Sequence, residues 1–314
     1  MIVATGGRGR RINQARKNNA EWNAQLNRTA TDSKGREKRM NILIVFSHPE
    51  GNSLNGALRD VAIDELRAQG HEVQVSDLYA QRWKAQIDRA DFPAWPADEK
   101  LDPRLASKRA FVSETLTDDV KAEHEKLRWA DAVIVQFPLW WFGMPAILKG
   151  WFERVYSHGY AYGVGEYTDK RWGDRYGEGV FAGKRAMILM TTGGWPHHYS
   201  GRGINGPMED ILFPINHGIL YYPGFEVLPP FIVYNAQRLE PERFETVSSD
   251  LRQRMRDLFT IAPIPYRQQN GGDYRIPEML LHDHIKTGET GFSVHLRDED
   301  DDAADLLAKQ GDDA

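Results

Sequence analysis

The amino-acid sequence predicts an α/β protein built on a doubly wound parallel sheet. Apolar runs of strand length recur along the chain, and segments with apolar residues at helical spacing separate them. Strands that alternate with helices in this way form parallel sheets joined by right-handed crossovers. Polar loops follow three of the runs, and in such sheets the loops at the carboxyl ends of the strands hold the ligand.

The first strand is expected at residues 41–47 (NILIVFS), a continuous apolar run typical of a strand buried on both faces. The following segment has apolar residues at helical spacing, and Gly70 stands where this helix would end. Residues 71–77 (HEVQVSD) alternate between polar and apolar, as a strand near an edge does. Residues 79–116 contain prolines and no clear period, so we expect an irregular surface excursion there.

Thr117 is placed to cap a helix that runs to about residue 129, because two acidic residues follow it in the first turn. Residues 131–137 (DAVIVQF) and 184–191 (KRAMILMT) predict two more buried strands. Pro145 suits the first turn of the helix between them. On that helix, Glu153 and Arg154 are interpreted as a surface or interface ion pair.

The last strand is expected at residues 225–234 (FEVLPPFIVY) and the last long helix at residues 240–259. Five parallel strands of this kind favour the flavodoxin-like order 2-1-3-4-5 over that of a nicotinamide-binding Rossmann sheet. The loop after the first strand contains neither G-x-G-x-x-G nor G-x-x-x-x-G-K-[ST], which argues against a dinucleotide turn and a P-loop.

Composition and charge exclude several classes of protein. The net charge of −5 gives no general reason to expect nucleic acid as a partner. Cysteine is absent, which excludes a disulfide framework or a cysteine nucleophile and is consistent with a cytoplasmic protein. No run approaches the roughly 18 apolar residues that a membrane span needs. The histidines at 197–198 and 282–284 lack a metalloprotease spacing, so no metal site is expected.

The two ends of the chain differ from its middle. Residues 1–39 hold ten basic residues against three acids and show no apolar period, so we expect a disordered basic extension. Because Met40 directly precedes the first strand, this stretch is best explained by an upstream start site. A basic tail for an acidic partner and an organellar transit peptide are the alternatives. Residues 298–314 are rich in Asp and Ala and predict a solvated acidic tail.

The loop after the first strand, residues 48–55 (HPEGNSLN), has the features of a phosphate site. It opens a helix, whose first amides lack helical partners and favour an anion. Ser53 and Asn55 offer further donors, and His48 can add a hydrogen bond to a pyrophosphate. The alternative is that Ser53 only caps the helix and His48 fills a turn.

The other two loops suit a flat ring system. Residues 137–145 (FPLWWFGMP) hold three consecutive aromatics, which cannot all point inward and would wall a tricyclic ring. In residues 191–199 (TTGGWPHHY), two glycines let backbone amides approach a ligand, the threonines can bond ring carbonyls, and Tyr199 offers a proton. An aromatic core cluster and an ordinary turn are the alternatives. All three loops belong to the same predicted sheet edge, which favours one shared ligand site.

Two of these segments carry a family resemblance. Residues 137–156 (FPLWWFGMPAILKGWFERVY) and 191–206 (TTGGWPHHYSGRGING) closely resemble the NAD(P)H:quinone oxidoreductases of the DT-diaphorase type. The first loop and residues 217–229 (HGILYYPGFEVLP) are similar to the same family, and residues 286–296 (KTGETGFSVHL) resemble the C-terminal extension of its longer members.

The resemblance implies a flavodoxin-like catalytic domain over residues 40–262 and a C-terminal extension over residues 263–297. It also implies tightly held FAD and a homodimer whose two active sites lie at the subunit interface. Hydride would pass from NADH or NADPH to quinone-like acceptors by a ping-pong mechanism, in two-electron steps. A nitro- or azo-reductase using the same site is one alternative. A regulatory flavoprotein that serves a partner such as a potassium efflux system is another.

The resemblance also assigns roles to individual residues. The residues that match FAD contacts are His48, Leu54, Asn55, Leu139, Trp140, Trp141, Phe142, Thr191, Thr192, Gly193, Gly194 and Tyr199. The catalytic set is Tyr199, Asn205 and Gly193, in which Tyr199 hydrogen-bonds the cofactor as hydride arrives. Tyr162 and Tyr222 match aromatics that cover the substrate.

The sequence departs from the family at three places. Asn205 stands where some members have a histidine that relays charge with the tyrosine. Val164 takes the place of a second substrate-covering tyrosine, and residues 165–179 are longer and more charged than their counterpart. The first departure leaves the proton relay open, and the other two leave the choice of acceptor open.

Overall fold

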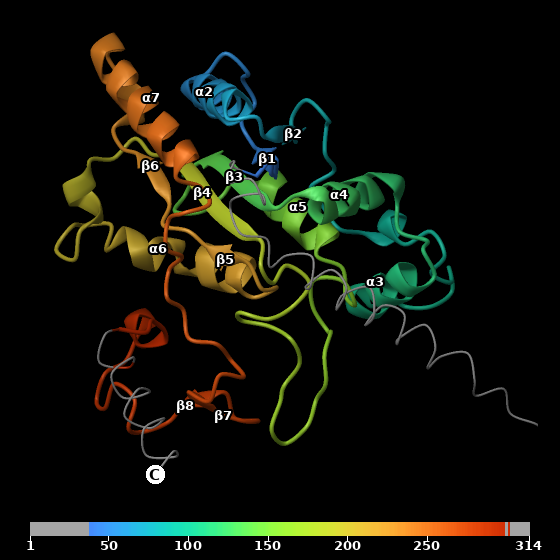
Figure 1. The fold of residues 1–314 in the computed structure, drawn as a ribbon. Coiled ribbons are helices and arrows are strands. Elements are labelled where there is room, and N and C mark those ends of the chain that lie inside the picture. The colour runs from blue at the N-terminus through green and yellow to red at the C-terminus, as the bar shows by residue number, and fades with distance from the viewer. Residues whose placement is uncertain (1–37, 299–300, 302–314) are drawn as a thin grey trace, which may run out of the picture.

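A parallel sheet forms the centre of the protein in a computed structural model that describes residues 38–298 and 301 (Figure 1). Its strands are β1 (Asn41–Phe46), β2 (Glu72–Asp77), β3 (Ala132–Pro138), β4 (Arg185–Thr191), β5 (Glu226–Val227) and β6 (Phe231–Val233). Their order is β2-β1-β3-β4-β5, β6 also pairs with β4, and all these pairings are parallel. The predicted flavodoxin-like order is confirmed.

The prediction of one continuous strand at residues 225–234 is wrong, because the segment forms two short strands, β5 and β6. β5 pairs with the beginning of β4, at Arg185, and β6 pairs with its end, at Thr191. Pro229 and Pro230 lie between the two pieces. Proline has no backbone N–H to donate to the ladder, so the strand is interrupted where the prolines stand.

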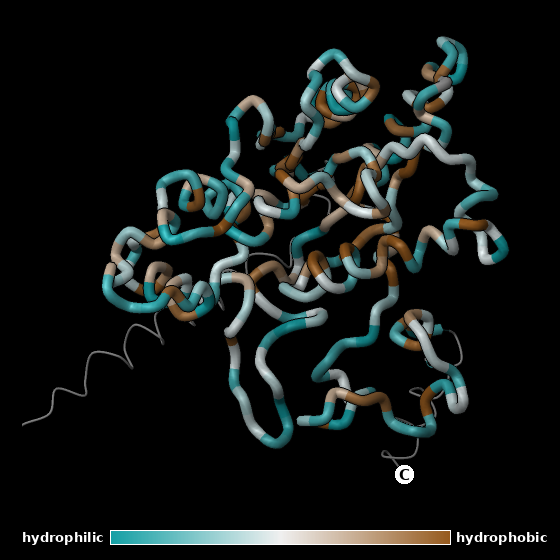
Figure 2. The backbone as a smooth tube through the Cα atoms, turned by 180° about the vertical axis from the view of Figure 1, so that it is seen from behind, coloured by the Kyte–Doolittle hydropathy of each residue, from teal (hydrophilic) through white to brown (hydrophobic). Residues whose placement is uncertain are grey.

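Helices cover both faces of the sheet (Figure 1). They are α2 (Leu54–Ala68), α3 (Pro103–Val112), α4 (Asp118–Trp129), α5 (Ala146–Val155), α6 (Met208–Ile215) and α7 (Pro241–Arg256). α2 and α7 pack against one face, and α4 and α5 pack against the other. Hydrophobic residues accordingly concentrate along the central strands (Figure 2). Among the described residues, no helix combines the length and the apolar character needed to cross a membrane.

The surface excursion expected at residues 79–116 contains a helix that the sequence did not indicate, α3. Asp102 accepts a hydrogen bond from the Leu105 amide at 3.0 Å, and Pro103 occupies the first turn. The helix buries only Ala106, Ser107 and Ala110. Because these buried residues are small, α3 leaves little apolar period in the sequence.

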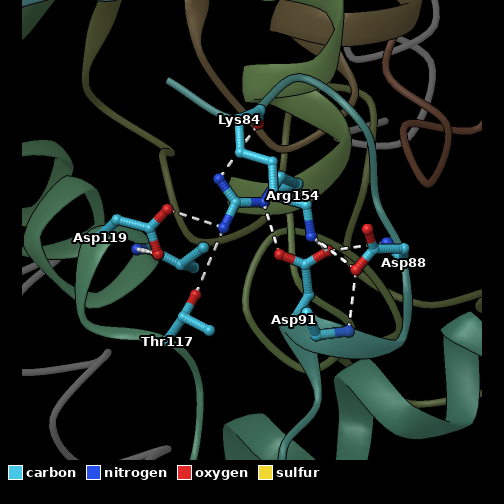
Figure 3. Close-up of polar contacts among 8 residues, drawn as sticks. Lys84, Asp88, Asp91, Thr117, Asp119 and Arg154 are labelled. Carbon is cyan, nitrogen blue, oxygen red and sulfur yellow. Dashed lines mark hydrogen bonds and ion pairs between the residues drawn. The ribbon is translucent and has the colours of Figure 1, made fainter. Parts of the chain in front are cut away.

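Arg154 of α5 forms ion pairs and hydrogen bonds that hold the excursion at residues 79–116 against that helix (Figure 3). Its side chain is 2% exposed, and it contacts Asp91 and Asp119 at 2.7 Å each. Its guanidinium also lies 4.6 Å from the ring centroid of Trp83. The interpretation of Arg154 as a surface ion pair is therefore wrong. Its neighbour Glu153 does form an exposed pair, with Lys149 at 2.6 Å.

The chain after α7 first contacts the sheet, where the Ile264 amide donates to the Val227 carbonyl of β5 at 2.7 Å, and then extends away from it (Figure 1). It contains an antiparallel pair, β7 (Tyr274–Arg275) and β8 (Leu280–Leu281), and a 3₁₀ turn over Phe292–His295. The ring of Phe292 stacks on Phe213 of α6 with centroids 4.2 Å apart. Except for residues 38, 39, 298 and 301, the predicted basic extension and acidic tail fall outside the described residues.

Candidate active site

The three predicted loops lie together at the carboxyl edge of the sheet. The amide of Ser47, after β1, donates to the Gln136 carbonyl at 2.9 Å. The amide of Leu139, after β3, donates to the Thr191 carbonyl of β4 at 2.8 Å. The buried Asn55 side chain donates to Oγ1 of Thr191 at 3.0 Å. These bonds connect the ends of β1, β3 and β4 and the start of α2, so the loops form one site.

The loop before α2 folds tightly onto the first turn of that helix. Oγ of Ser53 accepts from the Gly56 amide at 3.2 Å, which caps the helix. A Cβ on Gly56 would lie 1.8 Å from the Gly51 carbonyl oxygen, so only glycine permits this approach. The first amides of a helix lack intrahelical acceptors and attract anions. His48 stands beside this start and faces the second loop, with its ring centroid 6.4 Å from that of Trp140.

The second loop turns on two aromatic residues in the left-handed region. Trp140 and Gly143 exchange both backbone hydrogen bonds at 3.0 Å, which closes a two-residue turn. Trp141 and Phe142 fill this turn with φ of 49° and 61°. Such conformations cost about 1–3 kcal/mol for residues with a side chain, and they concentrate at functional sites. The indole of Trp141 is 98% exposed, so the strained turn presents an aromatic face outward.

The third loop folds back so that Tyr199 reaches the end of β4. Oη of Tyr199 lies 2.8 Å from Oγ1 of Thr192, and both residues are buried. A Cβ on Gly194 would stand 2.6 Å from the Tyr199 ring, so glycine is needed for the ring to pack there. Next to it, Gly193 faces the Gln237 side chain. The loop thus offers two hydroxyls and a backbone that a ligand can approach closely.

Large apolar side chains are exposed around these loops. They are Trp140, Trp141, Phe142, Trp195 and Ile204. Soluble monomers rarely expose so many large apolar residues in neighbouring loops unless a ligand or another chain covers them. These residues belong to the second loop and to the third loop or its continuation, and the third loop also holds the hydroxyls of Thr192 and Tyr199, so the site combines an apolar wall with a polar edge.

The hydrogen bond that Asn205 makes does not involve the hydroxyls of Tyr199 and Thr192. It is half-buried, and its amide N–H donates to the His198 carbonyl at 3.0 Å. Among the described residues, the Asn205 side chain makes no hydrogen bond to Tyr199. The partner of the tyrosine hydroxyl is Thr192 instead.

The two tyrosines assigned to the substrate wall lie near each other, and Tyr162 also lies beside α3. Burial raises the pKa of Tyr162, nearby Arg104 opposes that rise, and the neighbouring Tyr222 adds to it. The Tyr162 ring also packs edge-on against His158, with centroids 5.0 Å apart. Both tyrosines are half-buried, so part of each ring remains available to a ligand.

Gln136 is a site residue that the sequence reading missed. Its Nε2 donates to the Asn55 carbonyl at 2.6 Å, which holds the start of α2 against β3. Its Oε1 and the nearby Ser47 Oγ are buried without a hydrogen-bond partner. A fully buried polar residue within an apolar strand was the available signal. Within the described part of the chain, no cluster of three or more acids and histidines is arranged to hold a metal.

Comparison with known proteins assigns the fold to a family. The chain matches the flavodoxin-like fold family over residues 40–258. It is 58% identical over 261 residues to a ribosyldihydronicotinamide dehydrogenase-like protein of Penicillium crustosum, covering 83% of this chain and 97% of that protein. It is 40% identical over 223 residues to NAD(P)H dehydrogenase (quinone) 1 of Rattus norvegicus, covering 71% of this chain and 78% of that protein.

The chain belongs to the NAD(P)H:quinone oxidoreductase family. The resemblance of its loop sequences to that family is thereby confirmed. A solved structure of a candidate quinone reductase from Klebsiella pneumoniae agrees, with a TM-score of 0.81 and 56% identity over 82% of this chain and 100% of that one. The family consists of enzymes, and its members imply a flavin cofactor with NAD(P)H as the electron donor.

Proposed function

We propose that the protein is an FAD-dependent reductase that passes two electrons, as hydride, from NADH or NADPH to quinone-like acceptors. The observation that carries this proposal is the aromatic turn at the carboxyl edge. Trp141 and Phe142 are held in left-handed conformations and kept exposed beside a polar edge. An exposed aromatic face of this kind suits a flat, largely apolar ring with polar atoms along one side.

The residues of the site fit such a cofactor. Leu139, Trp140, Trp141 and Phe142 would pack along the ring, and the Gly193–Gly194 backbone and Thr192 would bond its polar edge. The start of α2, with His48 and Asn55, would bind the phosphates of the dinucleotide. The unpartnered Oγ of Ser47 and Oε1 of Gln136 lie where these loops begin. The bound flavin would supply the hydride chemistry, which no side chain here possesses.

Tyr199 would hold a proton at the polar edge of the site. Its hydroxyl is oriented by Thr192, so it is placed before the reaction to stabilise charge that develops there. The exposed aromatic wall is shared by the nicotinamide and the acceptor in this proposal. Because both compete for one surface, the first product leaves before the second substrate enters, which gives ping-pong kinetics.

A homodimer with composite sites is part of the proposal. Trp141 is 98% exposed and Ile204 is 93% exposed, which leaves apolar surface for a second copy to cover. Tyr162 and Tyr222 would then cover the substrate bound at the partner's cofactor. Twofold pairing is the commonest closed assembly, and it would place two identical sites at the interface.

The absorption spectrum of the purified protein, followed by anaerobic addition of NADH or NADPH, tests the function. We expect a yellow protein that bleaches with the nucleotide and recovers its colour with a quinone. Heat-released cofactor should be FAD, at one per chain. A colourless protein that takes up no flavin would contradict the proposal, and release of FMN would contradict the choice of cofactor. Sedimentation of an active monomer would contradict the dimer.

A further inference from the structure

The loop between α5 and β4 reaches both the substrate wall and the C-terminal part of the chain. In both views it extends from the sheet beside β7 and β8 (Figures 1 and 2). The amide of Tyr176 donates to the Tyr222 carbonyl at 2.9 Å, and the Tyr176 carbonyl accepts from the Gln269 amide at 3.2 Å. Tyr176 has a φ of 52°, an unusual conformation for a tyrosine. These bonds fix the loop against Tyr222.

Arg175 is held over the tyrosine rings by this arrangement. Its guanidinium lies 5.8 Å from the ring centroid of Tyr222 and 6.0 Å from that of Tyr176. The two rings meet edge-on, with centroids 5.0 Å apart. Nε of Arg175 donates to Oε1 of Gln269, which is 4% exposed and donates in turn to the Trp172 carbonyl at 2.7 Å. A buried amide therefore orients the guanidinium.

The positive charge of Arg175 has no acidic partner among the described residues. Two acids of the same loop pair with Arg171 instead, which contacts Asp174 at 2.7 Å and Glu178 at 2.6 Å. A guanidinium oriented through Nε keeps its two terminal nitrogens for an anion with two adjacent oxygens, such as a carboxylate or a sulfonate, which it can bind with two hydrogen bonds. Both Arg175 and Tyr222 are half-buried, so an anion can reach this position from solvent.

We propose that Arg175 is a specificity-determining residue that favours quinone-like acceptors carrying a carboxylate or sulfonate. The acceptor ring would lie along Tyr222 while its anionic substituent pairs with Arg175. This inference rests on the proposed function and narrows its substrate class. It also gives a role to the long charged loop at residues 165–179, in which Asp174 and Glu178 pair with Arg171 and not with Arg175.

Two quinones that differ in charge test the inference, namely 1,4-naphthoquinone-2-sulfonate and 2-methyl-1,4-naphthoquinone. Arg175→Met keeps the apolar stem and removes the charge. We expect it to raise KM for the sulfonate about 5- to 10-fold, as loss of a half-exposed, charge-assisted pair should, with kcat changed less than twofold. Parameters for the neutral quinone should stay within twofold. Arg175→Lys should retain part of the preference for the sulfonate.

Arg275→Met is the matched control, because Arg275 is also an arginine of the C-terminal part but pairs with Asp283 at 3.3 Å. Arg275→Met should leave kcat and KM for both quinones unchanged. If Arg175→Met raises KM equally for both quinones, or for neither, the inference is overturned. The proposed quinone reductase function would still stand. Calorimetric binding of 2-naphthalenesulfonate and 2-naphthol to the holoprotein separates the two proposals. If no quinone is reduced but sulfonate binding still depends on Arg175, the proposed function fails and the anion site stands.

Discussion

The hydroxyls of Tyr199 and Thr192 lie 2.8 Å apart at the carboxyl end of β4. Tyr199 is 9% exposed and Thr192 is 5% exposed, so water competes little for this hydrogen bond. The ring reaches β4 because Gly194 leaves the space that a Cβ would take. The pair is thus a fixed feature of the fold, and the hydroxyl that we propose as the proton donor is oriented before any substrate binds.

Tyr199→Phe should slow flavin reduction by NAD(P)H about 10²-fold. This is the low end of the range for a positioned proton donor, because the amides of the Gly193–Gly194 turn remain. Thr192→Val should slow it less, since the phenol stays but loses its orienting partner. Stopped-flow absorbance measures both rates. Ser200→Ala is the control, because the Ser200 hydroxyl is exposed and bonds only the His197 carbonyl in the described structure. Wild-type rates in Tyr199→Phe would remove Tyr199 from the mechanism.

Trp141→Gly should stabilise the apoprotein and weaken its hold on flavin. Glycine adopts the left-handed conformation without strain, although its unfolded chain has more entropy, so the net gain in unfolding free energy should be about 1 kcal/mol. Loss of one aromatic face from the site should raise the flavin Kd about tenfold. Denaturant unfolding and flavin titration measure the two effects. Tyr167→Ala removes an exposed aromatic elsewhere and should leave flavin affinity unchanged. Unaltered affinity in Trp141→Gly would contradict the proposed stacking role.

Arg154→Met should destabilise the protein by about 3–5 kcal/mol, because it leaves Asp91 buried without its partner. Lys149→Met on the same helix removes a pair that is about half exposed on both sides, and it should cost less than about 1 kcal/mol. Urea unfolding of both variants gives the comparison. Similar small losses in the two variants would show that the network in Figure 3 contributes little to stability.

His217→Phe should make the protein more resistant to acid. Burial, together with the nearby His295, lowers the pKa of His217 to about 4. The unfolded chain takes up this proton below about pH 6.5, whereas the folded chain resists it. The folded state therefore loses stability as pH falls from about 6.5 to 4, by at most about 3 kcal/mol. The His217 ring stacks on Phe213 and Tyr176, with centroid distances of 4.6 and 4.7 Å. Phenylalanine can keep this stacking and cannot titrate. If the unfolding free energy of the variant falls between about pH 6.5 and 4 as steeply as that of the wild type, His217 is not the group responsible.

The central fold could be predicted from the sequence, because strands buried on both faces leave continuous apolar runs. Such runs mark β1, β3 and β4 directly. α3 could not be predicted, since its buried face is made of small residues that carry no strong period. α6 was missed for a different reason, because Pro214 lies inside it and proline usually marks a helix end.

The candidate site was predictable as a set of loops but not as a set of contacts. Parallel strands bring their carboxyl ends to one edge, so three loops far apart in sequence had to meet. The pairing of Tyr199 with Thr192 depends on how the loop folds back, and the spacing of residues does not fix that. The position of Arg175 depends on Gln269, which lies 94 residues further along the chain, and sequence patterns do not register such a contact.

Asn205 gives the last prediction, which concerns the pH dependence of hydride transfer. An amide cannot take up a proton, and Thr192, which holds the tyrosine hydroxyl, does not titrate near neutrality. We therefore expect the rate of flavin reduction to be nearly flat from about pH 6 to 8. Asn205→His should introduce a titration near pH 6.5, the ordinary range of histidine, if its ring can reach Tyr199.

Stopped-flow reduction against pH, in wild type, Asn205→His and the double variant with Tyr199→Phe, separates the possible routes. If histidine acts through the tyrosine hydroxyl, the new titration should disappear in the double variant, because its effect on the reaction depends on that hydroxyl. If it persists there, histidine acts on the reaction directly. A clear step near neutrality in the wild type, unchanged in both variants, would show that a group other than Tyr199 and Asn205 carries the proton.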